Sequence, residues 1–164
     1  MKKIFYLMIC LFLVNCNKAE NKKAKKDFMK QLKQNVINGK RSSYDYLIEY
    51  YNNNPSNTYE LLPISILVAN KYKYENAYLM IYINLVEMEN NGKYHDSLFK
   101  NLNLGTKQMA LFYLNKGSKA QEISSITILE NLNRNGWGIP KNTKKADSLL
   151  NLEKKLFPGI EKMN

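Results

Sequence analysis

The sequence predicts an all-α domain in which short antiparallel helix pairs stack as a small repeat-type domain, similar to an α/α solenoid. Apolar residues recur at helical spacing in almost every segment after residue 26. Alternating apolar and polar runs, which are typical of strands, are missing. Short stops rich in Asn, Gly or Pro separate the segments, so helices that follow one another in the chain are expected to pack together.

Three helices are expected in the N-terminal part of this domain. The first covers residues 28–37, with an apolar stripe at Phe28, Leu32 and Val36, and ends at Asn38-Gly39, a sequence typical of a helix C-terminus. The third covers residues 59–72, where Pro63 is tolerated because it lies near the helix start. The second has apolar residues at i, i+3, i+4 and i+7, namely Tyr44, Leu47, Ile48 and Tyr51.

The later segments bring the expected total to about seven helices. A helix expected to stop at Lys116-Gly117 is followed by a helix over residues 123–135, a turn at 136–140 and a last helix. The clearest stripe contains Tyr74, Ala77, Tyr78, Ile81, Tyr82, Leu85 and Met88. The two other stripes are Met109, Phe112 and Tyr113, and Ala146, Leu149, Leu150 and Glu153. We expect the tyrosine-rich stripes to form the core rather than a ligand site, because tyrosine buries its ring well.

The N-terminus combines a lysine pair, a short apolar run and a cysteine. Two lysines precede an apolar run over residues 4–14, which ends in the sequence Leu-Val-Asn-Cys at residues 13–16. Such a run spans roughly 16 Å as a helix, about half of the hydrocarbon thickness of a bilayer. The run is therefore too short for a permanent transmembrane anchor. The segment resembles a bacterial lipoprotein signal, and this resemblance implies cleavage before Cys16 and attachment of lipid to its sulfur. Asn15 departs from the small residue usual there, so an ordinary secreted protein with an incidental Cys16 is the alternative.

This signal divides the chain into three expected parts. They are a signal peptide over residues 1–15, a flexible basic tether over residues 16–26 and an all-helical repeat-like domain over residues 27–164. The tether is either a solvated spacer or a segment whose lysines lie along anionic headgroups. Cys16 would be the sole cysteine of the mature chain, so the fold is expected to depend on its core alone.

The charge of the chain is strongly positive and comes mainly from lysine. Loss of Lys2 and Lys3 with the signal peptide lowers the net charge from +11 to +9. Only Arg41 and Arg134 are arginines, whereas nucleic-acid recognition favours the bidentate arginine fork. We expect no nucleic-acid partner, and the excess of lysine reflects either compositional drift or a functional cationic surface.

Residues 107–150 have the spacing of a known helical repeat. Residues 129–133 have the sequence Leu-Glu-Asn-Leu-Asn, residues 136–142 have Gly-Trp-Gly-Ile-Pro-Lys-Asn, and Lys145-Ala146 follow. In this register the segment resembles one unit of the SEL-one-like family, a relative of the tetratricopeptide repeats. Glu130 and Asn133 depart from the Gly and Tyr of that family. The resemblance implies a helical stack that binds proteins or peptides.

Four residues around this turn have expected structural roles. Gly136 and Gly138 allow the positive φ and close backbone approach that a tight turn between helices requires. Asn142 can cap the N-terminus of the next helix. Ala146 is small enough to let neighbouring helices approach each other.

Catalytic and metal-binding patterns are scarce in the sequence. His95 is the only histidine, and we expect it to be a loop residue. The sequence has no HExxH motif, no CxxC pair, no GxSxG motif and no phosphate-binding GxxxxGK motif. We therefore expect a protein that is not an enzyme and that holds neither a metal ion nor a cofactor.

The expected function is that of a lipid-anchored protein of the bacterial cell envelope that binds a protein partner. It would be a scaffold or assembly factor, or an immunity protein that neutralises a delivered toxin with an acidic surface. The alternative is a lipoprotein that recognises a glycan or peptide. Candidate binding residues are Trp137, Tyr72 and Tyr74, although Trp137 could equally pack over its own turn.

Overall fold

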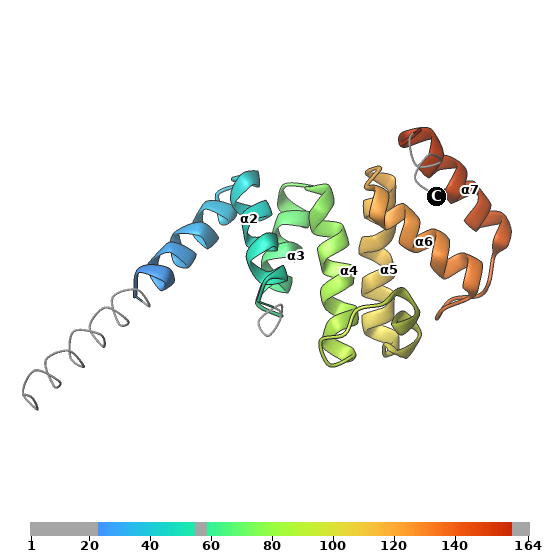
Figure 1. Ribbon diagram of the computed structural model, residues 1–164, viewed down its shortest axis with the longest axis horizontal. Helices are drawn as coiled ribbons and strands as arrows, with labels where there is room; N and C mark the ends of the chain where they lie inside the picture. Colours follow the sequence, from blue (N-terminus) through green and yellow to red (C-terminus); the bar gives the residue numbers. More distant parts are fainter. Residues whose placement is uncertain (1–22, 55–58, 159–164) are drawn as a thin grey trace, which may run out of the picture.

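The computed structural model describes residues 23–54 and 59–158. Every regular element within these ranges is a helix, and Figure 1 shows the helices side by side in an elongated row. The expected all-α fold of helices packed in sequence order is therefore confirmed. The predicted signal peptide and the lipid attachment residue Cys16 lie outside the described residues.

The N-terminal half of the row contains a helix over residues 23–37, α2 (Arg41–Asn52), α3 (Leu61–Lys71) and α4 (Glu75–Glu89). The first helix, drawn in blue, leans away from the row at the end opposite α7 (Figure 1). It includes residues 23–26, which we expected to belong to a flexible tether. The tether prediction is therefore wrong for these four residues, because they continue the helix whose buried face begins at Leu32 and Val36.

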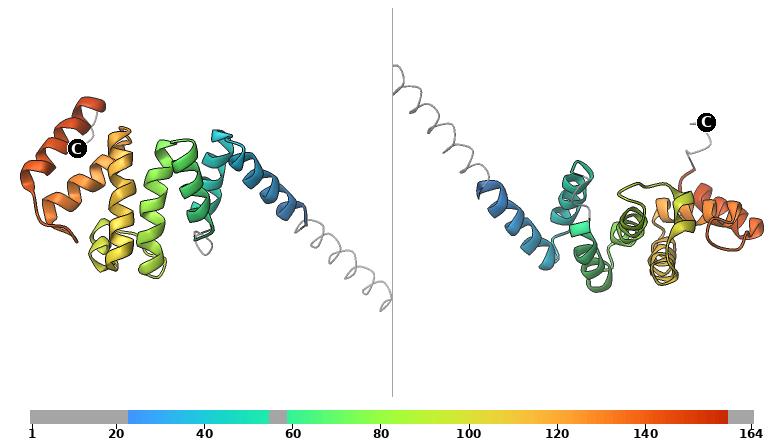
Figure 2. Two further views of the ribbon diagram at one scale, coloured as in Figure 1. Left: turned by 180° about the vertical axis from the view of Figure 1, so that it is seen from behind. Right: turned by 90° about the horizontal axis from the view of Figure 1, so that it is seen from below.

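The C-terminal half contains the 3-10 helix η2 (Asp96–Asn101), α5 (Leu104–Lys119), α6 (Ile123–Asn135) and α7 (Thr143–Leu156). The main packing partners are consecutive helices, in the pairs α3–α4, α4–α5, α5–α6 and α6–α7. Figure 2 shows the same order from behind and from below. η2 fills the long connection between α4 and α5 and also contacts α6.

Tyrosines are a large part of the core, as the stripes predicted. Tyr44, Tyr51 and Tyr82 are among the largest fully buried side chains. Tyr44 donates a 2.8 Å hydrogen bond from its hydroxyl to Ser65 Oγ, and Tyr82 stacks on Phe99 with ring centroids 5.9 Å apart. The buried rings thus join helices that follow one another in the chain.

Three predicted stripe residues are not in the core. Phe28, Met88 and Phe112 are each about half exposed, and Phe28 packs edge-on against the equally exposed Tyr46. Neighbouring side chains therefore cover each of the three only in part. Helical periodicity had placed them on the right helices without fixing which side of each helix meets a neighbour.

Gly117 lies inside α5, which continues through Lys119, so the predicted stop at this glycine is wrong. A Cβ atom at this position would meet Ser125 of α6, with the Cβ of that serine 2.9 Å away. Gly117 therefore allows α5 and α6 to approach each other closely, and it does not end the helix.

A polar cluster connects the first helix to the start of α3. Glu60 accepts hydrogen bonds from Lys33 Nζ at 2.8 Å and from the Tyr51 hydroxyl at 2.9 Å. The bond from Lys33, followed by that from Tyr51, holds the pKa of the Glu60 carboxyl below its ordinary value. The ionised form of Glu60 is therefore favoured in the folded protein.

We expect Gly117→Ala to lower the free energy of unfolding by about 1–2 kcal/mol. Overpacking costs about 1–3 kcal/mol, and the higher helix propensity of Ala returns up to about 1 kcal/mol. Urea unfolding measures the change. Gly105→Ala in the same helix is the matched control, because its added Cβ would meet only Asn103 Oδ1 at an ordinary 3.5 Å. An equal response of both variants would contradict the close α5–α6 contact.

The Glu60 cluster predicts a pH dependence of stability. The lowered pKa means that the contribution of Glu60 is present above pH 4.5 and is lost as pH falls through the folded-state pKa. Glu60→Gln should therefore destabilise the protein at neutral pH, by no more than about 1 kcal/mol because the side chain is partly exposed. The difference from wild type should disappear in acid. Unfolding at several pH values tests this, with the exposed Glu49→Gln on α2 as control.

Candidate partner-binding site

The turn between α6 and α7 has the conformation that its glycines predicted. Gly136 and Gly138 have φ values of 70° and 74°, in the left-handed region. Gly138 also lies directly against η2, where an added Cβ would be 2.8 Å from Phe99 Cδ1 and 3.0 Å from Lys100 Cα. Both the backbone conformation and the lack of space therefore favour glycine at residue 138.

Asn142 and Ala146 also have their predicted structural roles. The side-chain oxygen of Asn142 accepts a 2.9 Å hydrogen bond from the Lys145 backbone N–H and caps α7. Its own backbone N–H donates to the Asn133 carbonyl at 2.8 Å, which joins the turn to α6. Ala146 is completely buried at the α6–α7 interface. The turn is thus fixed at both of its ends.

A hollow of about 350 Å³ lies between α5, α6 and this turn, and we call it the polar hollow. Asn115 and Asn133 line it from the two helices, and Lys141 and Lys145 line it from the turn and α7. No acidic side chain is among its lining residues. The remaining lining residues are Leu111, Leu129, Ile139, Pro140 and Asn142.

The two asparagines of the polar hollow are held in place by their own helices. Asn115 Nδ2 donates to the Leu111 carbonyl and Asn133 Nδ2 donates to the Leu129 carbonyl, each at 2.6 Å. Each amide nitrogen is thereby turned back toward the helix backbone. The lysine ammonium groups are the positive charges at this site, so its chemistry suits a ligand group with negative charge.

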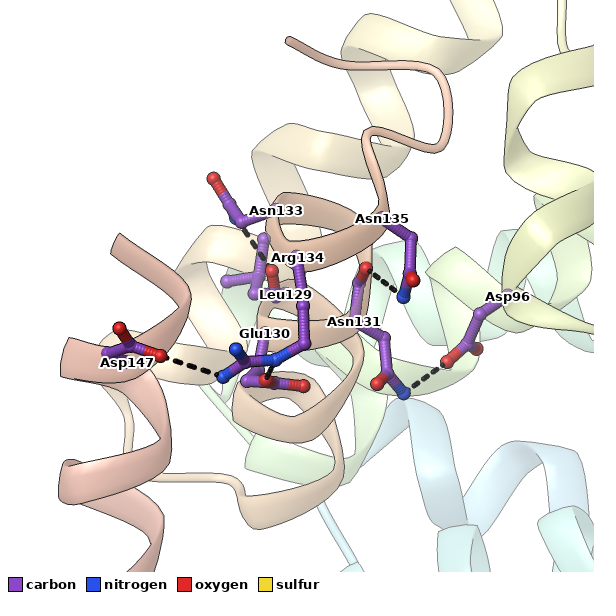
Figure 3. A network of polar contacts seen from close by, with 8 residues as sticks. All are labelled: Asp96, Leu129, Glu130, Asn131, Asn133, Arg134, Asn135 and Asp147. Carbon is purple, nitrogen blue, oxygen red and sulfur yellow. Dashed lines mark hydrogen bonds and ion pairs between the residues drawn. The ribbon is translucent and has the colours of Figure 1, made fainter. Parts of the chain in front are cut away.

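A network of polar contacts on the other face of α6 fixes this helix against its neighbours (Figure 3). Arg134 forms ion pairs with Glu130 on the same helix and with Asp147 of α7, the latter at 3.0 Å. Asn131 donates a 2.9 Å hydrogen bond to Asp96 of η2. Glu130, which departs from the glycine of the repeat pattern, is therefore part of the contact between α6 and α7.

Trp137 packs against its surroundings without being fully buried. Its ring centroid lies 5.9 Å from that of His95, with an angle of 55° between the rings. It contacts the core cluster and does not line the polar hollow. Trp137 therefore packs against His95 and the core, and part of its ring stays exposed.

Tyr72 and Tyr74 lie in the α3–α4 connection and are occupied by internal contacts. Tyr72 donates from its hydroxyl to the Ile37 carbonyl at 2.6 Å, and Tyr74 donates to the Gly39 carbonyl at 2.5 Å. Their rings stack with centroids 5.7 Å apart. The α3–α4 connection and the α6–α7 turn lie toward opposite edges of the row (Figure 1). The structure therefore does not bring these tyrosines together with Trp137, and they hold the first helix.

His95 is an exposed residue that caps η2. Its Nδ1 accepts from the Ser97 backbone N–H at 3.2 Å. Within residues 23–54 and 59–158, no three His, Cys, Asp or Glu side chains come close enough together to hold a metal ion. No helix in the same ranges has the length and apolar character needed to cross a membrane.

Comparisons of this chain with protein-family models, with curated proteins and with solved structures find no match. The resemblance of residues 107–150 to a SEL-one-like unit therefore stays a prediction.

The polar hollow was not predicted from the sequence. One signal was present, because Asn115 follows the apolar stripe of one predicted helix and Asn133 follows that of the next. Asparagine is uncommon on a face that packs against other helices, and two such residues on consecutive helices suggest a shared polar site. Sequence alone gave no reason to place Lys141 and Lys145 beside them.

We expect Arg134→Met to lower the free energy of unfolding, because the mostly buried Glu130 would lose its cationic partner. The double variant Glu130→Met/Arg134→Met should recover most of this loss, since it removes both charges together. Chemical denaturation of the single and double variants gives the coupling energy. Additive effects of the two substitutions would show that the pair contributes nothing to the α6–α7 contact.

Proposed function

We propose that this protein is a lipid-anchored lipoprotein of the bacterial cell envelope that binds a protein partner and catalyses no reaction. The polar hollow is the observation that supports it most. It combines two lysines with two fixed carboxamides and four apolar residues, and its lining includes no acidic side chain. Such a surface suits an acidic residue of a partner protein.

The residues around the polar hollow hold it in one fixed shape, and this supports a role in binding. Glycine conformation and the Asn142 cap fix the turn, and the ion pairs of Arg134 fix α6 against α7. A preformed surface loses less conformational entropy when a partner binds. The partly exposed ring of Trp137 lies on the same turn and adds an aromatic anchor of the kind that interfaces favour.

The membrane location rests on the sequence before the described residues. The lysine pair, the apolar run over residues 4–14 and Cys16 together have the pattern of a lipoprotein signal. More than one acyl chain holds a protein stably on a bilayer. The folded part would then need no membrane-spanning helix of its own.

Cys16→Ala is expected to release the protein from membranes. The substitution removes the sulfur to which lipid is attached, and no acyl chain then anchors the chain. Fractionation of cells followed by a salt wash and immunoblotting measures the effect. A variant that still sediments with washed membranes would contradict the lipid anchor. Cys10→Ala is the matched control and should leave the distribution unchanged.

Reversal of the charges in the polar hollow is expected to abolish capture of the partner. We propose crosslinking in intact cells, purification of the lipidated protein and mass spectrometry of the captured proteins. Lys141→Glu/Lys145→Glu should lose the partner because it would repel an acidic surface. Trp137→Ala should weaken capture. The control Lys93→Glu/Lys119→Glu makes an equal charge change at exposed residues outside the hollow and should retain the partner.

The captured proteins would also separate the two forms of this function. One acidic partner whose capture falls with salt would favour an immunity protein that neutralises a toxin. Several resident envelope proteins would favour a scaffold or assembly factor. Identical capture by wild type and by the charge-reversed variant would contradict the assignment of the polar hollow as the binding site.

The volume of the polar hollow favours one second candidate, the recognition of a glycan or short peptide. About 350 Å³ is near the lower end of the range for small-ligand sites. Trp137 is the only tryptophan and lies two residues before Ile139, a lining residue. A ligand that fills the hollow should change the fluorescence of Trp137 and raise the melting temperature of the protein. Unchanged fluorescence and melting across a glycan and peptide panel would exclude this candidate.

A further inference from the structure

The helix over residues 23–37 has a row of lysines along one face. Lys23, Lys26, Lys30 and Lys33 are separated by three, four and three residues, which places them on the same side of a helix. We call these four residues the basic stripe. They span about 15 Å along the helix axis. Leu32 and Val36 are buried on a different face, so the stripe does not pack into the core.

Three of these lysines have no acidic partner among the described residues. Lys33 is paired with Glu60, whereas Lys23, Lys26 and Lys30 are exposed and form no ion pair within those ranges. The whole helix has five lysines against a single acidic residue, Asp27. It is therefore a concentrated positive surface at one end of the molecule.

The basic stripe borders an open groove of about 890 Å³ that lacks the anchors of a protein interface. Its lining includes neither an aromatic side chain nor an arginine. Protein interfaces concentrate their binding energy in such residues. Lysine is a hydrated point charge on a flexible stem, which suits headgroups that demand no fixed geometry.

The position of this helix in the chain also favours lipid headgroups as its binding partner. Lys23 follows Cys16 by seven residues, and seven residues of extended chain reach at most about 25 Å. A chain anchored by lipid on Cys16 would keep Lys23, the first residue of the basic stripe, within that distance of the bilayer surface. The helix also leans out from the row at the end opposite α7 (Figure 2).

We propose that the basic stripe docks the domain on anionic lipid headgroups. This inference rests on the proposed lipid anchor and adds an orientation to it. With the first helix against the bilayer, α7 lies at the end of the row farthest from this contact (Figure 1). The polar hollow between α5, α6 and the α6–α7 turn then lies toward the membrane-distal end, where a partner can reach it.

The test uses the full lipidated chain in two kinds of vesicle. One contains only phosphatidylcholine, and the other contains in addition about 30% phosphatidylglycerol, which supplies the negative surface potential. Both contain a trace of a lipid with a photoreactive headgroup. Mass spectrometry then measures the yield of crosslinks to residues 23–37.

We expect at least about a fivefold higher yield in the anionic vesicles, which is the gain from one lysine near such a surface. Salt at about 0.5 M should remove the difference through screening. Lys23→Gln/Lys26→Gln/Lys30→Gln should lower the yield to that of neutral vesicles. The matched variant Lys93→Gln/Lys119→Gln/Lys155→Gln loses the same charge at exposed residues elsewhere and should keep the difference.

Failure of the docking and failure of the lipid anchor would be distinguishable. A chain that does not float with neutral vesicles has no functional lipid anchor, and this would overturn the proposed function. A chain that floats but gives equal yields in both lipids would overturn the docking. In a further experiment, polyglutamate is added while the lipid concentration saturates the protein with vesicles. Loss of the crosslinks under this condition would assign the basic stripe to an acidic protein and would overturn the proposed docking on lipid.

Discussion

The burial of α4 between α3 and α5 is the constraint on which the rest of the row depends. α4 has buried side chains around most of its circumference, including Ala77, Tyr78, Tyr82 and Val86. A helix with this pattern is stable in water only when other elements cover it on more than one side. Residues 17–164 contain no cysteine, so no disulfide in this part of the chain can replace that packing. The order of the helices in space follows from this requirement.

The geometry of the C-terminal end depends on the same packing. Tyr82 of α4 stacks on Phe99 of η2. Phe99 lies so close to residue 138 that only glycine, which has no side chain, fits there. Gly117 lets α6 approach α5. The polar hollow is therefore shaped by contacts that begin at α4, although none of its lining residues belongs to that helix.

The two ends of the row differ in what surrounds their lysines. In the basic stripe, Lys23, Lys26 and Lys30 lie on an exposed helix face and form no ion pair within the described residues, which suits a surface without fixed geometry. The lysines of the polar hollow lie beside carboxamides whose nitrogens are bonded to the helix backbone, which suits a partner of defined shape. Similar residues can thus serve a membrane at one end and a protein at the other. The helices between them set the separation.

Features that depend on neighbouring residues could be predicted from the sequence. The helix over residues 123–135, the left-handed conformation of Gly136 and Gly138 and the Asn142 cap all follow from local backbone geometry. These features are local because each involves residues within one or two helical turns. The sequence therefore determined the helices and the turn at the candidate site.

The tertiary structure decided which helix faces meet. Periodicity shows that residues share a helix face, but it does not show whether another helix covers that face. Met88 and Phe112 lie on predicted stripes and are nevertheless exposed. The same holds for Gly117, which allows close packing, and for Tyr72, which bonds to a carbonyl 35 residues away. The polar hollow is also of this kind, because it exists only where two helices and a turn come together. Contacts across such distances depend on the packing of the whole row, and local sequence does not encode them.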